Sequence, residues 1–263
     1  MSQHKDSVFD TTEAINWQHQ DEQTFGAFPW GPHRLPLKLV LDNLALSLVK
    51  KGNQYLYRRE GQGGSVEKTL LAGNGEIYLC PVEPFHHPAG VSQHLLLQFD
   101  HPVLLAPRSN EKINLTFPLE IAVMFNHKQF GETALDIFSF ILPKLALYGS
   151  LKNGLVCRYW QSVIHHDIPH LNPAAEGVMA LTINNSGNRW SEVKQALFSA
   201  QAMKIYYNKQ LVAMQATMKI NSEITAETSV IDEPFKTGMH KAPEQFSAGL
   251  LKLPGRLVME EGY

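Results

Sequence analysis

Short segments in which apolar and polar residues alternate, separated by turns, recur along almost the whole chain. The clearest run lies between residues 37 and 48, where leucine occupies positions 37, 39 and 41 and then positions 44, 46 and 48. A period of two places these side chains on one face of a β-strand. Similar segments follow at intervals of roughly 8 to 12 residues, with glycine, proline, asparagine or aspartate between them. This spacing predicts an all-β fold, because a βαβ unit would need long helices between its strands.

The strand candidates form two series, with a more polar break around residues 126–133 between them. The first series is 37–41, 44–49, 54–59, 76–82, 93–99, 102–106, 113–116 and 119–125, and the second is 134–140, 144–149, 154–162, 177–184, 203–207, 211–220 and 223–231. We therefore expect two antiparallel β-sandwich-like domains, at residues 30–130 and 131–235. A single large domain built from two sheets is the alternative.

The two ends of the chain differ from this pattern. Residues 1–29 are polar with scattered aromatic side chains, which predicts an N-terminal arm that is peripheral to the core. Residues 236–263 are rich in glycine, proline and lysine, and we expect a C-terminal extension that packs as a return strand or stays loose.

Two segments of the second series carry more specific local signals. Asn208 and Lys209 stand between two apolar runs, where a hairpin turn is expected because asparagine tolerates a positive φ. Residues 190–200 fit the spacing of a helix face and also that of a strand face, so either structure is compatible with this segment.

Composition excludes several classes of partner. The 263 residues include 23 Lys and Arg against 25 Asp and Glu, so no excess positive charge would attract nucleic acid. The N-terminal residues lack the apolar core of a signal peptide, and no stretch approaches ~18 uncharged apolar residues, so we expect no membrane insertion. Cys80 and Cys157 are far apart in sequence, which is typical of buried reduced thiols in a cytoplasmic protein.

Three strings of residues are the most distinctive in the chain. They are ALYGSLKNGLVCRYWQS at residues 146–162, GEIYLCPVEP at 75–84 and FPLEIAVMF at 117–125. Together they resemble blocks of a prokaryotic family described as domain of unknown function 432. The resemblance covers about residues 35–231 and implies a fold family without an activity, so it supplies no catalytic residue.

Histidine is the main candidate for chemistry, since the sequence has no GxSxG, phosphate-binding loop or HExxH motif. Two groups are dense: Glu83, His86 and His87, and then His165, His166, Asp167 and His170. Imidazoles and a carboxylate on one loop can supply ligands to a divalent transition metal such as zinc, iron or manganese. The second group can do so only if the strand ends near Ile164, because adjacent residues on a strand point to opposite faces. The alternative is that these histidines are solvent-exposed loop residues.

Three other side chains are candidates for binding a ligand: Arg158, Trp160 and Glu120. On a strand, Arg158 and Trp160 share a face, so the guanidinium could clamp a carboxylate or phosphate beside the indole ring. Alternatively, Arg158 pairs with an acidic neighbour across the sheet. Glu120 lies on an apolar strand, where it is either a buried carboxylate with a raised pKa or a solvent-facing residue. Arg58 and Arg59 are interpreted as a solvated strand end.

Three functional hypotheses follow. The favoured one is a non-catalytic cytoplasmic module that binds a protein partner or a small ligand through its loops or the cleft between domains. The second is a metal-dependent enzyme that uses the loop at residues 165–170. The third is an oligomeric structural or regulatory protein whose N-terminal arm crosses to a neighbouring subunit.

Overall fold

The computed structural model describes residues 15–16, 28–41, 44–61, 64–72, 74–129, 131–245 and 256–263. Within these residues the regular structure is β-strand, apart from one 3-10 turn at Ala200–Ala202. The predicted all-β fold is confirmed. In this part of the chain, no helix is long and apolar enough to cross a membrane.

The strands are numbered in chain order. They are β1 (Ile15–Asn16), β2 (Gly31–His33), β3 (Leu37–Leu41), β4 (Leu44–Lys51), β5 (Gln54–Gly61), β6 (Gly64–Leu71), β7 (Gly75–Val82), β8 (His94–Leu105), β9 (Asn110–Pro118), β10 (Glu120–His127), β11 (Gly131–Phe138), β12 (Lys144–Tyr148), β13 (Leu155–Ser162), β14 (Glu176–Asn185), β15 (Ser191–Ser199), β16 (Tyr206–Tyr207), β17 (Val212–Ile220), β18 (Ala226–Ile231), β19 (His240–Lys241) and β20 (Arg256–Met259).

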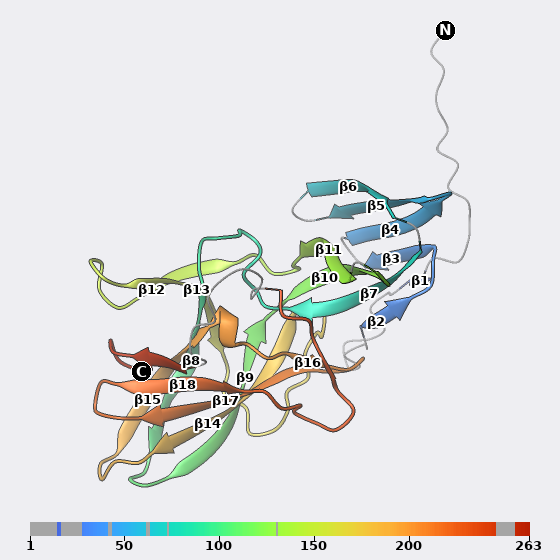
Figure 1. The fold of residues 1–263 in the computed structure, drawn as a ribbon. Coiled ribbons are helices and arrows are strands. Elements are labelled where there is room, and N and C mark those ends of the chain that lie inside the picture. Colours follow the sequence, from blue (N-terminus) through green and yellow to red (C-terminus); the bar gives the residue numbers. More distant parts are fainter. Residues whose placement is uncertain are drawn as a thin grey trace.

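The first sandwich packs the sheet β1-β3-β4-β5-β6 against the sheet β11-β10-β7-β2 (Figure 1). The alternating leucines whose side chains are described in β3 and β4 are buried, as their period of two predicts: Leu37, Leu39, Leu44, Leu46 and Leu48. Between the two sheets, the rings of Tyr55 and Phe125 meet edge to face with their centroids 5.3 Å apart. The apolar face of each sheet is thereby covered by the other sheet.

The second sandwich packs the sheet β12-β13-β8-β15 against a seven-stranded sheet of order β19-β16-β17-β14-β9, in which β18 and β20 extend from β17. Contacts between the sheets include a hydrogen bond from Trp160 Nε1 to Thr116 Oγ1 at 2.8 Å. These sheets are mixed, because β13 runs parallel to β8 and β14 runs parallel to β17. The expectation of purely antiparallel sheets therefore applies to most strand pairs, but not to these two or to β1 and β3, which are also parallel.

The chain crosses between the two sandwiches more than once. Strands β8 and β9 belong to the second sandwich, but β10 and β11 return to the sheet that contains β7. The division expected at residue 130 consequently lies inside the β10–β11 hairpin and does not coincide with the boundary between the sandwiches. Lys128 and Gln129 of this turn are solvent-exposed, which accounts for their polar character.

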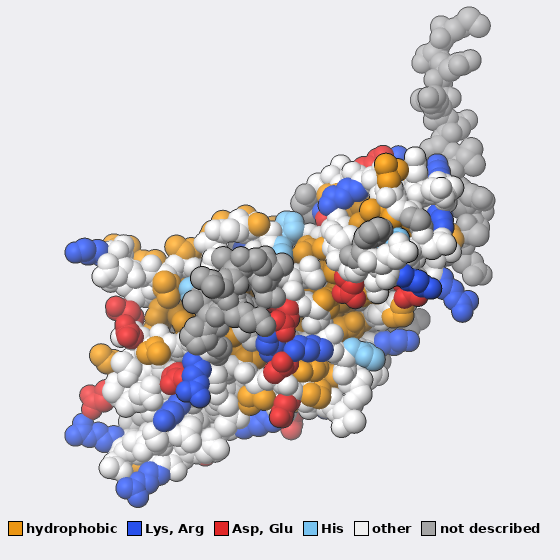
Figure 2. Space-filling view, in the orientation of Figure 1, with side chains coloured by type: hydrophobic (Ala, Val, Ile, Leu, Met, Phe, Trp, Pro, Cys, Tyr) orange, Lys and Arg blue, Asp and Glu red, His pale blue; other side chains and the backbone are white. Residues whose placement is uncertain are grey.

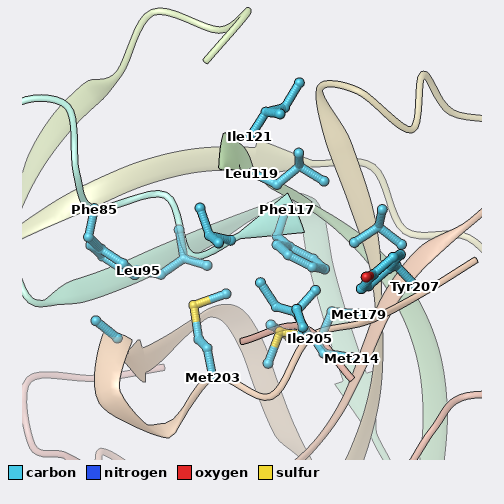
Figure 3. Close-up of a cluster of buried hydrophobic side chains, with 14 of the residues drawn as sticks. Phe85, Leu95, Phe117, Leu119, Ile121, Met179, Met203, Ile205, Tyr207 and Met214 are labelled. Atoms are coloured by element: carbon cyan, nitrogen blue, oxygen red, sulfur yellow. The ribbon is translucent and has the colours of Figure 1, made fainter. Parts of the chain in front are cut away.

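One hydrophobic core runs through both sandwiches. Figure 3 shows Phe117, Leu119 and Ile121, which follow the crossing from β9 to β10, among Phe85 and several methionines of the second sandwich. A Cβ atom at Gly177 of β14 would lie 2.5 Å from the Phe117 ring, so the close approach of this ring requires glycine. The crossing strand is thus part of the packing that joins the sandwiches.

The structure decides the ambiguous segment at residues 190–200 and tests the hairpin expected at Asn208. Residues 191–199 form strand β15, which is antiparallel to β8. The hairpin predicted at Asn208 is confirmed, since β16 pairs antiparallel with β17. Asn208 does not use a positive φ there; its Oδ1 accepts hydrogen bonds of 2.9 Å from the backbone N–H groups of Gln210 and Leu211.

The two ends of the chain contribute strands. In the C-terminal extension, β20 pairs antiparallel with β18, which is the return strand considered from the sequence. In the arm, β1 pairs parallel with β3, and Phe28 is buried against Trp30. The rest of the arm, residues 1–14 and 17–27, lies outside the described residues.

Candidate functional site

A buried polar cluster lies where the chain crosses between the sandwiches, in the connection from β7 to β8. Glu120, the first residue of β10, is only 3% exposed. Its carboxylate accepts hydrogen bonds from the backbone N–H groups of His86 at 3.0 Å and His87 at 3.1 Å, and Nδ1 of His86 lies 2.9 Å from the same carboxylate. The interpretation of Glu120 as a solvent-facing residue is therefore wrong.

Arg158 holds the other side of the same connection. Its side chain is 3% exposed, and Nη2 donates to the carbonyl oxygens of His87 and Pro88. Glu120 thus binds the N–H groups of the loop while Arg158 binds its carbonyl groups, so two of the predicted ligand-binding residues lie in one cluster. Nε and Nη1 of Arg158 have no hydrogen-bond partner among the described protein groups.

Trp160, the third predicted residue, is directed elsewhere. It lies two residues after Arg158 on β13, and its indole nitrogen donates to Thr116 on the opposite sheet. The ring therefore closes the space between the sheets of the second sandwich. The structure brings Arg158 and Glu120 together with His86 and His87 and leaves Trp160 in a packing position.

Burial and hydrogen bonding shift the pKa values of this cluster in different directions. Burial alone would raise the pKa of Glu120, but hydrogen bonds from His86 and His87 hold it below its ordinary value, opposite to the raised pKa considered from the sequence. For His86, burial lowers the pKa, yet Glu120 and Glu83 more than offset this effect and raise it. Burial raises the pKa of Glu83 to about 7. Glu83 can therefore exchange a proton near neutral pH.

Glu83 gives this cluster a testable pH dependence. A carboxyl group whose pKa is raised on folding favours the folded state while the group is protonated. For Glu83 this contribution to stability is fully present below the ordinary pKa of 4.5, and it is lost as the pH rises through about 7. We expect Glu83→Gln to stabilise the protein at pH 8 by on the order of 3 kcal/mol and to change little at pH 4. Denaturant unfolding at both pH values measures the difference. Glu60→Gln, at an exposed site on β5, is the control, and an equal effect of Glu83→Gln at both pH values would contradict the assignment.

A pocket of about 440 Å³ lies on the second sandwich, beside the predicted histidine loop. It is lined by Lys112, Asn114, His166, Asp167, Ile168 and Phe235. Asn114 is in β9, and its backbone N–H and C=O groups pair with the C=O and N–H groups of His165 at 2.9 Å. This bridge attaches the loop to the edge of the large sheet and forms the wall of the pocket.

The carboxamide of Asn114 is the most unusual polar group of the pocket. Its Nδ2 donates to the carbonyl oxygen of His166 at 3.0 Å. Its Oδ1 is buried and has no hydrogen-bond partner among the described protein groups. Such a buried acceptor is costly unless something donates to it, by about 1–3 kcal/mol. Nearby, Nζ of Lys112 lies 5.5 Å from the centre of the Phe235 ring.

The four proposed metal ligands are only partly brought together. Strand β13 ends at Ser162, as the metal hypothesis requires, and the loop then turns along β9. His166 and Asp167 line the pocket, but His165 and His170 do not. Across the described ranges, no group of three or more histidine, cysteine, aspartate or glutamate residues is placed to hold a metal ion.

Several important residues were not identified from the sequence. Lys112, Asn114 and Phe235 line the pocket, although they are far apart in sequence and belong to no motif. Arg59 was interpreted as solvated, but it is buried and its Nε lies 2.5 Å from Asp136 Oδ2. Of these residues, only Asn114 could have been identified from the sequence, because its amide lies between Ile113 and Leu115 on an apolar strand.

The fold and these sites define a class: an all-β protein of two sandwiches joined by a buried polar crossing, with a polar pocket on the second sandwich. A family model described as a protein of unknown function, DUF432, matches residues 29–255 of the chain. The chain belongs to this family, which confirms the resemblance seen in its sequence. No curated protein and no solved structure matches the chain.

Proposed function

We propose that this protein is a non-catalytic binding module that holds a small polar ligand in the pocket beside Asn114. The observation that carries the proposal is the buried Oδ1 of Asn114, an acceptor without a protein donor at the wall of an open pocket. Binding sites combine an apolar surface with a few convergent polar groups, and this pocket has both kinds of lining.

The lining supports a particular chemistry for the ligand. An N–H or O–H group of the ligand would supply the hydrogen-bond donor that Asn114 Oδ1 lacks among the described protein groups. Lys112 supplies a positive charge for a carboxylate or phosphate, and Phe235 and Ile168 supply apolar surface. A small molecule that carries both a hydrogen-bond donor and an anionic group would satisfy these features together.

A ligand screen by saturation-transfer NMR tests the proposal. The probes are small amines, amides and polyols with a carboxylate or phosphate, each paired with an analogue in which the donor is methylated. We expect the donor-bearing members to bind and the methylated analogues to lose about tenfold in affinity, which is the effect of one buried hydrogen bond.

Variants locate the binding site. Lys112→Ala and Phe235→Ala leave the bond from Asn114 to the loop in place, so they are expected to weaken binding without unfolding the loop. Lys219→Ala, at an exposed lysine of β17 away from the pocket lining, is the matched control and should bind as the unmodified protein does. Hits that bind all three variants equally well would contradict the proposed site.

We also infer that the protein works in a reducing compartment such as the cytoplasm. This inference is supported by Cys80 and Cys157, which are free thiols buried in β7 and β13. Burial raises the pKa of the Cys157 thiol to about 11, so this thiol is a poor nucleophile and resists oxidation.

A further inference from the structure

The β12–β13 hairpin exposes more apolar surface than a closed fold needs. It projects at the left of Figure 1, and Figure 2 shows hydrophobic side chains along this part of the surface. The exposed fractions are 47% for Leu145, 39% for Leu147, 98% for Leu151 and 46% for Val156. Leu145 and Leu147 are two residues apart on β12, so they share one face of the strand. Several exposed apolar side chains on one hairpin are typical of an interaction site.

Strand β12 also forms the free edge of its sheet, which is ordered β12-β13-β8-β15. No other strand of the described ranges pairs with the outer side of β12, so its backbone groups there can pair with a strand of another molecule. Proteins normally protect such edges with charged residues, because charges oppose the approach of a second strand. The charged residues of an edge strand therefore indicate whether the strand is protected from pairing or can pair with a second strand.

The other long edge strands of the described sheets all carry charges within the strand. The charged residues are Glu67 and Lys68 in β6, Glu111 and Lys112 in β9, Glu132 and Asp136 in β11, and Glu192 and Lys194 in β15. Strand β12 reads Lys-Leu-Ala-Leu-Tyr, so its only charge is at its first residue. Among these edges, β12 alone lacks the usual protection.

The sequence of β12 is complementary to itself in an antiparallel pair. A two-fold axis perpendicular to the sheet leaves every side chain on the same face of the sheet. Residues that oppose each other across the axis must then be an even number of positions apart, so the pairing is centred on a residue and not between two residues. Centring on Ala146 pairs the whole strand. Leu145 then opposes Leu147 of the second copy, and Lys144 opposes Tyr148. No like charges meet in this register, which would otherwise be destabilising.

We propose that β12 pairs with β12 of a second copy of this chain, which joins the two four-stranded sheets into one continuous sheet across a two-fold axis. The hairpins contribute the apolar surface of Leu145, Leu147 and Val156 to the interface. Because the strand has only five residues, the interface is small and the dimer is concentration-dependent. This dimer is independent of the ligand pocket, since none of its residues lines that pocket.

Sedimentation velocity over a range of protein concentrations, up to the solubility limit, tests the dimer. We expect the unmodified protein to shift from monomer to dimer, and the exposed-site variants Leu145→Lys and Leu147→Lys to remain monomeric. Leu71→Lys, on the protected edge strand β6, is the matched control and should still dimerise. An unmodified protein that stays monomeric, or lysine variants that dimerise normally, would overturn the proposal.

Disulfide cross-linking tests the register. The native thiols Cys80 and Cys157 are buried and do not compete. A mixture of Leu145→Cys and Leu147→Cys proteins should form a covalent heterodimer under mild oxidation faster than either protein forms a homodimer, because these positions oppose each other across the axis. Equal rates in the mixture and in the separate proteins would exclude the pairing centred on Ala146.

Discussion

Replacing Asp136 by alanine is expected to destabilise the protein by about 3–5 kcal/mol, because it leaves the buried guanidinium of Arg59 without its counter-charge. Asp136 Oδ2 lies 2.5 Å from Arg59 Nε and accepts a second hydrogen bond of 2.7 Å from Tyr57. Both side chains of the ion pair are almost fully buried between the sheets of the first sandwich. The carboxylate therefore connects β11 to β5 through two charged or polar partners.

Urea unfolding of matched variants measures this effect. The control is Arg58→Ala, at the residue before Arg59. This substitution removes the exposed ion pair between Arg58 and Glu67 and should change the stability by at most about 1 kcal/mol. The double variant Arg59→Met, Asp136→Leu should recover most of the loss, since apolar residues of similar volume often replace a buried ion pair without destabilisation. An Asp136→Ala protein as stable as Arg58→Ala would show that the pair is hydrated in solution.

Glu120→Gln is expected to be the second most damaging substitution, with a loss of about 3 kcal/mol or more. The amide can accept only at its oxygen, so its NH₂ group would face one of the donors of His86 or His87. It also removes the negative charge that favours the protonated His86 and the charged Arg158. Both effects weaken the connection that joins the two sandwiches.

Glu120→Gln should also destabilise the loop at His86 and His87 locally, in addition to lowering the stability of the whole protein. Hydrogen exchange of the His86 and His87 amides is expected to accelerate in the Glu120→Gln protein, because their acceptor is altered. Glu223→Gln, in an exposed ion pair with Arg189, is the control for a surface carboxylate. Unchanged protection of the two amides, or a loss no larger than that of Glu223→Gln, would contradict the role of Glu120 as the anchor of this loop.

The elements of the fold were predictable where one face of a strand is polar. Leucines at every second residue in β3 and β4 predict both the strands and their buried face. The structure confirms the strands, and it buries Leu37, Leu39, Leu44, Leu46 and Leu48. Buried strands lose this signal. In β10, residues 120–125 are all buried, so alternation could not show on which side Glu120 lies.

The pairing of the strands was not predictable from local patterns. The assignment of β8 and β9 to the second sandwich depends on contacts with β13 and β14, which come much later in the chain. Sequence spacing shows where a strand begins and ends, but strand pairing is determined by the packing of the whole core. The same limit explains why the expected division at residue 130 falls inside a hairpin.

The candidate sites were only partly predictable, for a related reason. Arg158 and the loop at His86 and His87 are about 70 residues apart, and the structure brings them together through hydrogen bonds that no spacing rule anticipates. The loop that follows β13 was identified by its histidines, yet its most informative neighbour is Asn114 on another strand. A buried unpartnered atom is a property of the packed structure and has no sequence motif.

A crystal structure of the protein soaked with the hits of the ligand screen shows whether the pocket beside Asn114 is the binding site. We expect a ligand in the pocket beside the 166–168 loop, with its N–H or O–H group within hydrogen-bond distance of Asn114 Oδ1 and its anionic group towards Lys112. Hits that occupy only other surfaces, with Asn114 Oδ1 satisfied by an ordered water molecule in every structure, would contradict this expectation.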